Sequence, residues 1–484
     1  MLTSSMASPE PFCEKKNKQS SFQRFRSSKG AVLFVCSLAL FTDMLVYGIV
    51  IPILPSILRS IGIPAEHETT YSTILFSAYA LGLFLATPVF GILSDKTGNR
   101  MTPMLLGLAG LALTTILFAI SSHFYILLLA RFLQGIAGAA SWVVGMALIA
   151  DTFPINQLGS SLGFVMSFNT VGFICGPIIS GYAATYISLR SPFYICALFA
   201  LLDFVSRIIL KPPKSAKPEA SCLEVAPASQ PDQSLPDTAT APKASLLKRF
   251  FASDIISMLC HIEIFLLCFG VTLETASMSI IEALIAEYLE VYFGLSISEC
   301  SNTLLFFILP SAFFSILMGK LTDTYSRSRL IIIGTLLHSV ASPFVALAST
   351  LTQFRIAAVM FGLSTSFMVT PIMPQMTFLI GSYGKHTTSY AKLYSLYLIF
   401  CSLGMVLGPI IAGLLMSSIS FLAAMFVFPI MGCLVFLPLF VTITIYKERS
   451  RFRLANLSDT LSPFSFFREL FIPLPEPVYS KSFI

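Results

Sequence analysis

The sequence predicts an all-α membrane protein with twelve transmembrane helices, arranged as two pseudo-symmetric six-helix bundles around a central cavity. Three observations lead to this prediction: a composition poor in charge, twelve long apolar runs, and motifs that recur in the two halves of the chain. The 484 residues are 55% hydrophobic and only 11% charged, whereas a water-soluble protein carries roughly 25% charged residues. So few charges cannot cover a surface that faces water, but they suffice for one that faces lipid.

Each apolar run is long enough to cross a bilayer. A spanning helix needs about 20 mostly apolar residues, because the hydrocarbon core is about 30 Å thick and offers the backbone no water. The first six runs occupy residues 31–56, 71–93, 103–121, 124–150, 159–185 and 190–210. The second six occupy residues 255–285, 301–320, 329–349, 354–380, 387–415 and 418–446.

Polar segments divide the chain into five parts. We expect an N-terminal tail at 1–30, a six-helix bundle at 31–211, a flexible linker at 212–250, a second bundle at 251–446 and a C-terminal tail at 447–484. The linker is rich in Pro, Ala, Ser and charge, so it cannot bury enough apolar surface to fold. The N-terminal tail is too long and too polar for the start of a cleaved signal peptide, so the first run is expected to stay as a helix.

The basic residues indicate how the helices are oriented. If the N-terminus is cytoplasmic, that side receives nearly all Lys and Arg, and the opposite side keeps only Arg59, Arg190 and Arg355. This arrangement satisfies the positive-inside rule. We therefore predict a multi-pass membrane protein with both termini in the cytoplasm, in the plasma membrane or in a vacuolar or vesicular membrane. The net charge of +6 is thereby explained by orientation, and no nucleic-acid partner is expected.

Two motifs occur once in each half. GILSDKTGNR at 91–100 is matched by GKLTDTYSRS at 319–328, and GFICGPIISG at 172–181 is matched by GMVLGPIIAG at 404–413. The two pairs are separated by nearly the same number of residues, so the halves are copies. Transporter folds are commonly built from such repeats, with the substrate site near the midplane between them. The duplication therefore predicts a secondary transporter that works by alternating access.

The first of these motifs resembles a known family signature. The residues that match GxLxDxxGR, the loop signature of the major facilitator superfamily, are Gly91, Asp95, Gly98 and Arg100. Asp323 and Arg327 stand in the second, weaker copy. Such charges can pair with neighbouring charges or helix ends and latch one conformational state, so we interpret them as a gating loop. The alternative is that they are solvated charges that only orient the chain.

Further motifs narrow the resemblance, which covers residues 31 to 446. Arg131 and Gln134 resemble the family's fourth-helix motif, and residues 41–58 resemble the first helix of the vesicular amine and multidrug branch. The fifth-helix motif of drug:proton antiporters resembles a stretch found in both halves. Its residues are Gly172, Gly176, Pro177 and Gly181, and then Gly404, Gly408 and Pro409. Glycine and proline let helices approach and bend, and generic helix packing is an equal alternative.

Four charged residues stand out within the apolar runs: Asp43, Arg131, Glu274 and Glu282. A charge at the bilayer centre costs at least about 3 kcal/mol, so such residues are functional candidates. The repeat makes Glu274 the counterpart of Asp43, and we expect the two acids to face each other across the cavity, binding a proton on one side and releasing it on the other. By resemblance, Glu282 falls where vesicular monoamine transporters carry an acid. For Asp43 the alternative is a structural hydrogen bond. For Glu274 it is a wide polar face of the seventh helix, and for Glu282 it is a carboxylate exposed to water near the non-cytoplasmic end of that helix.

The predicted cavity lining combines aromatic, thioether and amide side chains. Such a lining suits a moderately hydrophobic organic substrate, although each residue could equally be packing. Monoamine transporters also carry aspartates in the tenth and eleventh helices, where this chain has Val369 and Leu398. The candidates are Tyr47, Gln134, Asn169, Met373 and Tyr397.

These observations favour a proton-coupled antiporter that exports a drug-like or secondary-metabolite molecule. One alternative is a uniporter or proton symporter importing a sugar or monocarboxylate, for which Arg131 is the basic candidate. Another is a transport-inactive membrane sensor. No Ser/His/Asp cluster or phosphate-binding loop occurs, so neither an enzyme nor nucleotide binding is predicted. The cysteines form no CxxC pair, and we expect no metal, no cofactor and a monomer.

Overall fold

The computed structural model describes most of the two predicted bundles. Within the described residues every regular element is a helix, and twelve helices are long and apolar enough to cross a membrane. The predicted linker at 212–250, the tail at 447–484 and Gly98 lie outside this part of the chain. The described residues are 28–97, 100–153, 155–209, 258–382, 389–418 and 421–445.

The first half contains six spanning helices and one short turn of helix. These are α2 (Lys29–Ser60), η1 (Ala65–His67), α3 (Glu68–Thr97), α4 (Met101–Ile120), α5 (Phe124–Thr152), α6 (Ile155–Tyr186) and α7 (Ser191–Ile209).

The second half repeats the order, with two spans interrupted. It contains α10 (Ile262–Phe293), α11 (Ile297–Thr324), α12 (Arg327–Leu347), α13 (Leu351–Val369), α14 (Ile372–Ser382), α15 (Ser389–Ser418), α16 (Phe421–Met431) and η2 (Gly432–Phe436). The helices α13 and α14 form one span, interrupted at Thr370 and Pro371, because proline has no N–H to donate to the carbonyl group four residues earlier. η2 is one π-helical turn that carries the last span on to Ile445.

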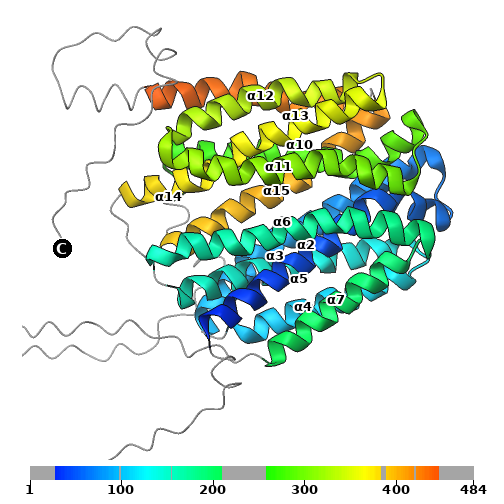
Figure 1. Ribbon diagram of the computed structural model, residues 1–484, viewed down its shortest axis with the longest axis horizontal. Coiled ribbons are helices and arrows are strands. Elements are labelled where there is room, and N and C mark those ends of the chain that lie inside the picture. The colour runs from blue at the N-terminus through cyan, green and yellow to red at the C-terminus, as the bar shows by residue number, and fades with distance from the viewer. Residues whose placement is uncertain are drawn as a thin grey trace, which may run out of the picture.

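The two halves lie side by side, with α2–α7 in the lower part of Figure 1 and α10–α13 in the upper part. The first span of each half is its most buried helix. In the most apolar 18-residue stretch of α2 and of α10, 78% of the residues are buried, against 28% in α6 and 22% in α11. Helices that are apolar on every side belong in an interior, so α2 and α10 lie at the centre and the others expose a face to lipid.

Helix α10 lies further along the chain than the sequence predicted, and begins at Ile262 rather than at 255. Its predicted end at 285 was wrong, because the helix continues to Phe293 and ends at Gly294, which adopts the left-handed backbone (φ 67°) that suits a helix C-terminus. The last two turns carry Glu287 and Glu290, which lower the local hydropathy. Glu282 therefore lies about three turns before the helix end, and it is buried.

Glycines bring the central helices into close contact with their neighbours. In the first half, a Cβ on Gly176 would lie 2.8 Å from the backbone of Gly48, which places α6 directly against α2. In the second half, a Cβ on Gly404 would collide with the backbone of α10 near Thr272, and one on Gly408 with that near Ala276. The repeated glycine motif thus performs the same packing role twice, as small residues do between membrane helices.

Replacing Gly176 by alanine should destabilise the first half. The added methyl group has no space against the α2 backbone, and such overpacking costs about 1–3 kcal/mol. We expect a lower thermal unfolding midpoint in detergent, measured by loss of helical circular dichroism. Gly163→Ala is the matched control on the same helix, since nothing lies within 4 Å of its Cβ position. An equal midpoint for the two variants would contradict this packing.

Candidate functional site

A buried arginine occupies the interior of the first half. Arg131 on α5 is 0% exposed, and its Nη1 donates a hydrogen bond to Oε1 of Gln134 at 3.2 Å. Its Nε and Nη2 have no hydrogen-bond partner among the described residues. The guanidinium instead lies between 5.5 and 5.8 Å from four aromatic ring centres, an arrangement that stabilises a cation. The rings belong to Tyr47, Phe76, Tyr79 and Phe118.

Asp43 lies on the neighbouring helix α2 and is 1% exposed. The indole Nε1 of Trp142 donates to its Oδ2 at 3.0 Å, and the hydroxyl of Tyr79 donates to the same oxygen at 3.4 Å. The other carboxyl oxygen, Oδ1, has no hydrogen-bond partner in the described part of the chain. Two donors from α5 and α3 thus hold this acid inside the first half.

Glu282 on α10 connects the second half to the first. The hydroxyl of Tyr47 on α2 donates to its Oε2 at 2.5 Å. The ring of Tyr47 also packs on that of Tyr79, with ring centres 4.9 Å apart. Together these contacts form a continuous row across the two halves, with Arg131 beside its middle. We call Glu282, Tyr47, Tyr79, Asp43 and Trp142 the polar row.

Glu274 occupies a separate place in the second half. It is 4% exposed, and its carboxyl group lies beside Thr365 on α13 and close to Tyr397 on α15. No hydrogen bond to Asp43 occurs within the described residues. The expectation that these two acids face each other across a cavity therefore stays a prediction.

The structure brings together only some of the predicted lining residues. Tyr47 and Gln134 contact Arg131, and Tyr397 lies near Glu274. Asn169 on α6 is half-buried, and its Nδ2 has no partner among the described groups. Met373 is half-buried on α14, a helix that contributes no residue to the polar row.

One predicted gating residue forms an ion pair. Nε of Arg100 lies 3.0 Å from Oδ2 of Asp151, so the start of α4 is tied to the end of α5. In the second half, the guanidinium of Arg327 lies 5.4 Å from the ring centre of Phe378 on α14. Gly91 lies within α3. The side chains of Asp95 and Asp323 are outside the described part of the structure.

Sequence reasoning missed an ion pair buried in α7. Asp203 and Arg207 are both 0% exposed. Nε of Arg207 donates to Oδ1 of Asp203 at 3.5 Å, and its Nη2 donates to the Val35 carbonyl oxygen at 3.3 Å. Opposite charges four residues apart within an apolar run are the signal that would have revealed the pair. Trp142 and Tyr79 were also missed, because nothing local in the sequence links them to Asp43.

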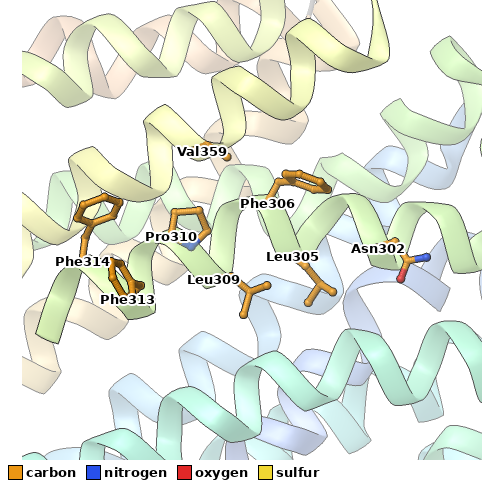
Figure 2. A pocket seen from close by; sticks show the side chains of 8 residues that line it. All are labelled: Asn302, Leu305, Phe306, Leu309, Pro310, Phe313, Phe314 and Val359. Atoms are coloured by element: carbon orange, nitrogen blue, oxygen red, sulfur yellow. The ribbon is translucent and has the colours of Figure 1, made fainter.

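A hollow of about 580 Å³ lies along α11 (Figure 2). Its lining is almost entirely apolar and includes Phe313, which is 68% exposed. None of the five predicted lining residues borders it. This hollow lies on the exposed surface of α11 and α13. Its lining consists of Asn302, Leu305, Phe306, Leu309, Pro310, Phe313, Phe314 and Val359.

Two repeated six-helix halves that enclose buried charges define a membrane transport protein rather than an enzyme. The family model described as Major Facilitator Superfamily matches residues 36–272 and 267–475. The chain therefore belongs to the major facilitator superfamily, as the sequence motifs predicted.

Several relatives resemble the chain over different lengths. An uncharacterized MFS-type transporter of Schizosaccharomyces pombe is 28% identical over 415 residues, which cover 82% of this chain and 92% of the relative. The vesicular acetylcholine transporter of Drosophila melanogaster is 25% identical over 430 residues, covering 82% of this chain and 68% of the relative. The class B tetracycline resistance protein of Escherichia coli is 37% identical over 163 residues, covering 34% of this chain and 40% of the relative.

Trp142 is the single tryptophan of the chain, so intrinsic fluorescence should report on Asp43 directly. Excitation moves electron density away from the indole nitrogen, and a carboxylate at that nitrogen stabilises the excited state. Protonation of Asp43 at low pH should therefore shift the emission to shorter wavelength. Asp43→Asn should abolish this pH dependence and leave the fluorescence otherwise intact. A pH-dependent shift that persists in the variant would contradict the contact.

Proposed function

We propose that the protein is a proton-coupled antiporter that exports a small organic molecule by alternating access. The observation that carries the proposal is the polar row, in which two buried carboxyl groups lie on opposite sides of the boundary between the halves. The hydroxyl of Tyr47 bridges that boundary to Glu282. Rocking of one half against the other would change this contact directly.

Protonation would change what each acid in the row can do. An ionised carboxylate only accepts hydrogen bonds, whereas a protonated one can also donate. Asp43 as a carboxylate suits its two donors, Trp142 and Tyr79. Protonated Glu282 would be able to donate a hydrogen bond as well as to accept one from Tyr47. The proton count of the row and the position of the halves are thereby coupled.

Arg131 supplies the counter-charge for this site. It has no carboxylate within hydrogen-bond distance among the described residues, and aromatic rings surround it instead. A cation held in this way stabilises nearby carboxylates through space without trapping either of them in a salt bridge. Asp43 and Glu282 would then remain able to bind and release protons during the cycle.

The second half of the chain and the relatives support a proposal for the substrate class. Glu274, Thr365 and Tyr397 combine a carboxyl group, a hydroxyl group and an aromatic ring, which suits a weakly polar organic molecule that carries a basic group. The relatives include proteins named for acetylcholine transport and tetracycline resistance. We propose that Glu274 binds such a substrate.

The orientation is proposed from the distribution of basic residues. With both termini cytoplasmic, the start of α4 and the start of α12 face the cytoplasm. The Arg100–Asp151 ion pair and the contact of Arg327 with Phe378 would then stabilise helix ends on that side. The protein would act in the plasma membrane or in a vacuolar or vesicular membrane.

Asp43→Asn should abolish transport driven by a pH gradient. The amide keeps the size of the side chain and a hydrogen-bond acceptor but cannot exchange a proton. Liposomes with an acidic interior would be tested for uptake of acetylcholine, tetracycline and a panel of organic cations and carboxylates. The matched control is Glu66→Gln, which neutralises an exposed acid in η1.

Two results would rule out the coupling. One is pH-driven uptake by Asp43→Asn at the level of the unsubstituted protein. The other is substrate exchange that is equally fast at every pH, which would identify a uniporter. A variant that unfolds is recognised by its gel-filtration profile and helical circular dichroism.

One observation favours a second candidate function, the import of a monocarboxylate. Two nitrogens of Arg131 lack hydrogen-bond partners among the described residues, and a guanidinium binds a carboxylate in a forked geometry. Uptake of carboxylates but not of cations in the liposome panel, lost in Arg131→Gln, would identify this function instead.

A further inference from the structure

The end of the bundle opposite the start of α2 carries charged residues that are not part of the polar row. We call it the distal end; it is where α2 finishes at Ser60 and α10 finishes at Phe293. Three acids and one arginine meet there: Glu68 on α3, Glu287 and Glu290 on α10, and Arg59 on α2.

Arg59 bridges the two halves. Its Nη2 forms an ion pair with Oε2 of Glu290 in the second half, and its Nε lies 3.1 Å from Oε1 of Glu68 in the first half. The side chains of Arg59 and Glu290 are 41% and 34% exposed, whereas that of Glu68 is 6% exposed. The contact within the first half thus has one buried partner, Glu68, whereas both partners of the contact between the halves are open to solvent.

A second contact between the halves lies next to Arg59. The hydroxyl of Thr69 on α3 donates to Oε1 of Glu287 at 2.5 Å. Together with the bond from Tyr47 to Glu282, three acids along α10 each accept from a group of the first half. The distal part of α10 is therefore attached to the first half from its middle to its last turn.

We propose that the pair of Arg59 and Glu290 is the distal gate of the transporter, which holds the two halves together at this end and separates each time the end opens. The proposal rests on the alternating access of the proposed function, but on neither its protons nor its substrate. An exposed ion pair contributes little to stability. It can therefore favour the closed arrangement and still break in every cycle, which a buried pair such as Asp203–Arg207 could not do readily.

Glu68 provides an internal comparison. It contacts the same guanidinium as Glu290, but from within the first half. Loss of its charge therefore leaves the connection between the halves in place. If Arg59 acts as a gate, only the partner in the other half should affect closure. If Arg59 merely orders the end of α2, both partners should matter.

The test measures the distance between the halves at the distal end. Spin labels are attached to unnatural ketone-bearing residues at Ser188, between α6 and α7, and at Ser349, between α12 and α13; both positions are exposed. This chemistry leaves the native cysteines in place. Distance distributions are recorded by double electron–electron resonance on the full chain in lipid nanodiscs, without any substrate.

We expect a short distance in the otherwise unsubstituted chain. Arg59→Gln and Glu290→Gln should each raise the ratio of long to short distances by about two- to fivefold, as for loss of an exposed pair. The double variant should open no further than Arg59→Gln alone, because both changes remove one contact. Glu68→Gln should leave the ratio unchanged, and Arg59→Lys, which keeps the charge, should stay largely closed.

Any of three results would overturn the proposal. The unsubstituted chain could already show the long distance, Glu290→Gln could leave the distribution unchanged, or Glu68→Gln could open the distal end as far as Glu290→Gln does. Should Arg59→Gln fail to fold, Glu290→Gln against Glu68→Gln decides the question alone. Distances are measured independently of flux, so failure of the gate and failure of proton coupling are distinguished.

Discussion

A carboxyl group removed from water needs a hydrogen-bond donor, because leaving it unpaired costs several kcal/mol. Glu282 finds its donor in the other half of the molecule, the hydroxyl of Tyr47. This requirement makes the boundary between the halves polar at its centre, although nearly everything around it is apolar. Tyr47 can reach Glu282 only while α2 and α10 stay close. Through Tyr47, this one contact between central helices links Glu282 to the aromatic rings around Arg131 and, by way of Tyr79, to Asp43.

The small residues of the repeated motif make such closeness possible. Gly176 lets α6 lie against α2, and Gly408 lets α15 lie against α10. Each central helix is thereby held by a neighbour from its own half. The same motif that resembles the antiporter signature thus brings neighbouring helices against α2 and α10, the two helices that carry the buried acids. Packing and chemistry are in this way set by the same few residues.

The fold could be predicted almost completely from the sequence, and the site only in part. Long apolar runs and the two repeats identified all twelve spans, and an isolated charge such as Asp43 is visible within an apolar run. Its partners are not, because Tyr79 and Trp142 lie 36 and 99 residues away in the chain. The end of α10 was missed because Glu287 and Glu290 look like the start of a loop. Their partners, Thr69 and Arg59, come from the other half.

The π-helical turn η2 has a consequence for how alike the two halves are. A π turn holds one more residue than an α turn, so the side chains after Gly432 point in directions that the sixth span of the first half cannot reproduce. The ring of Phe436 fills the space left by the missing side chain of Gly270 on α10. Through this ring, the last span packs closely against α10, the central helix of its half. The two halves therefore differ in how their last span packs against their central helix. In the second half, a tilt of α10 would also move the last span that carries Phe436.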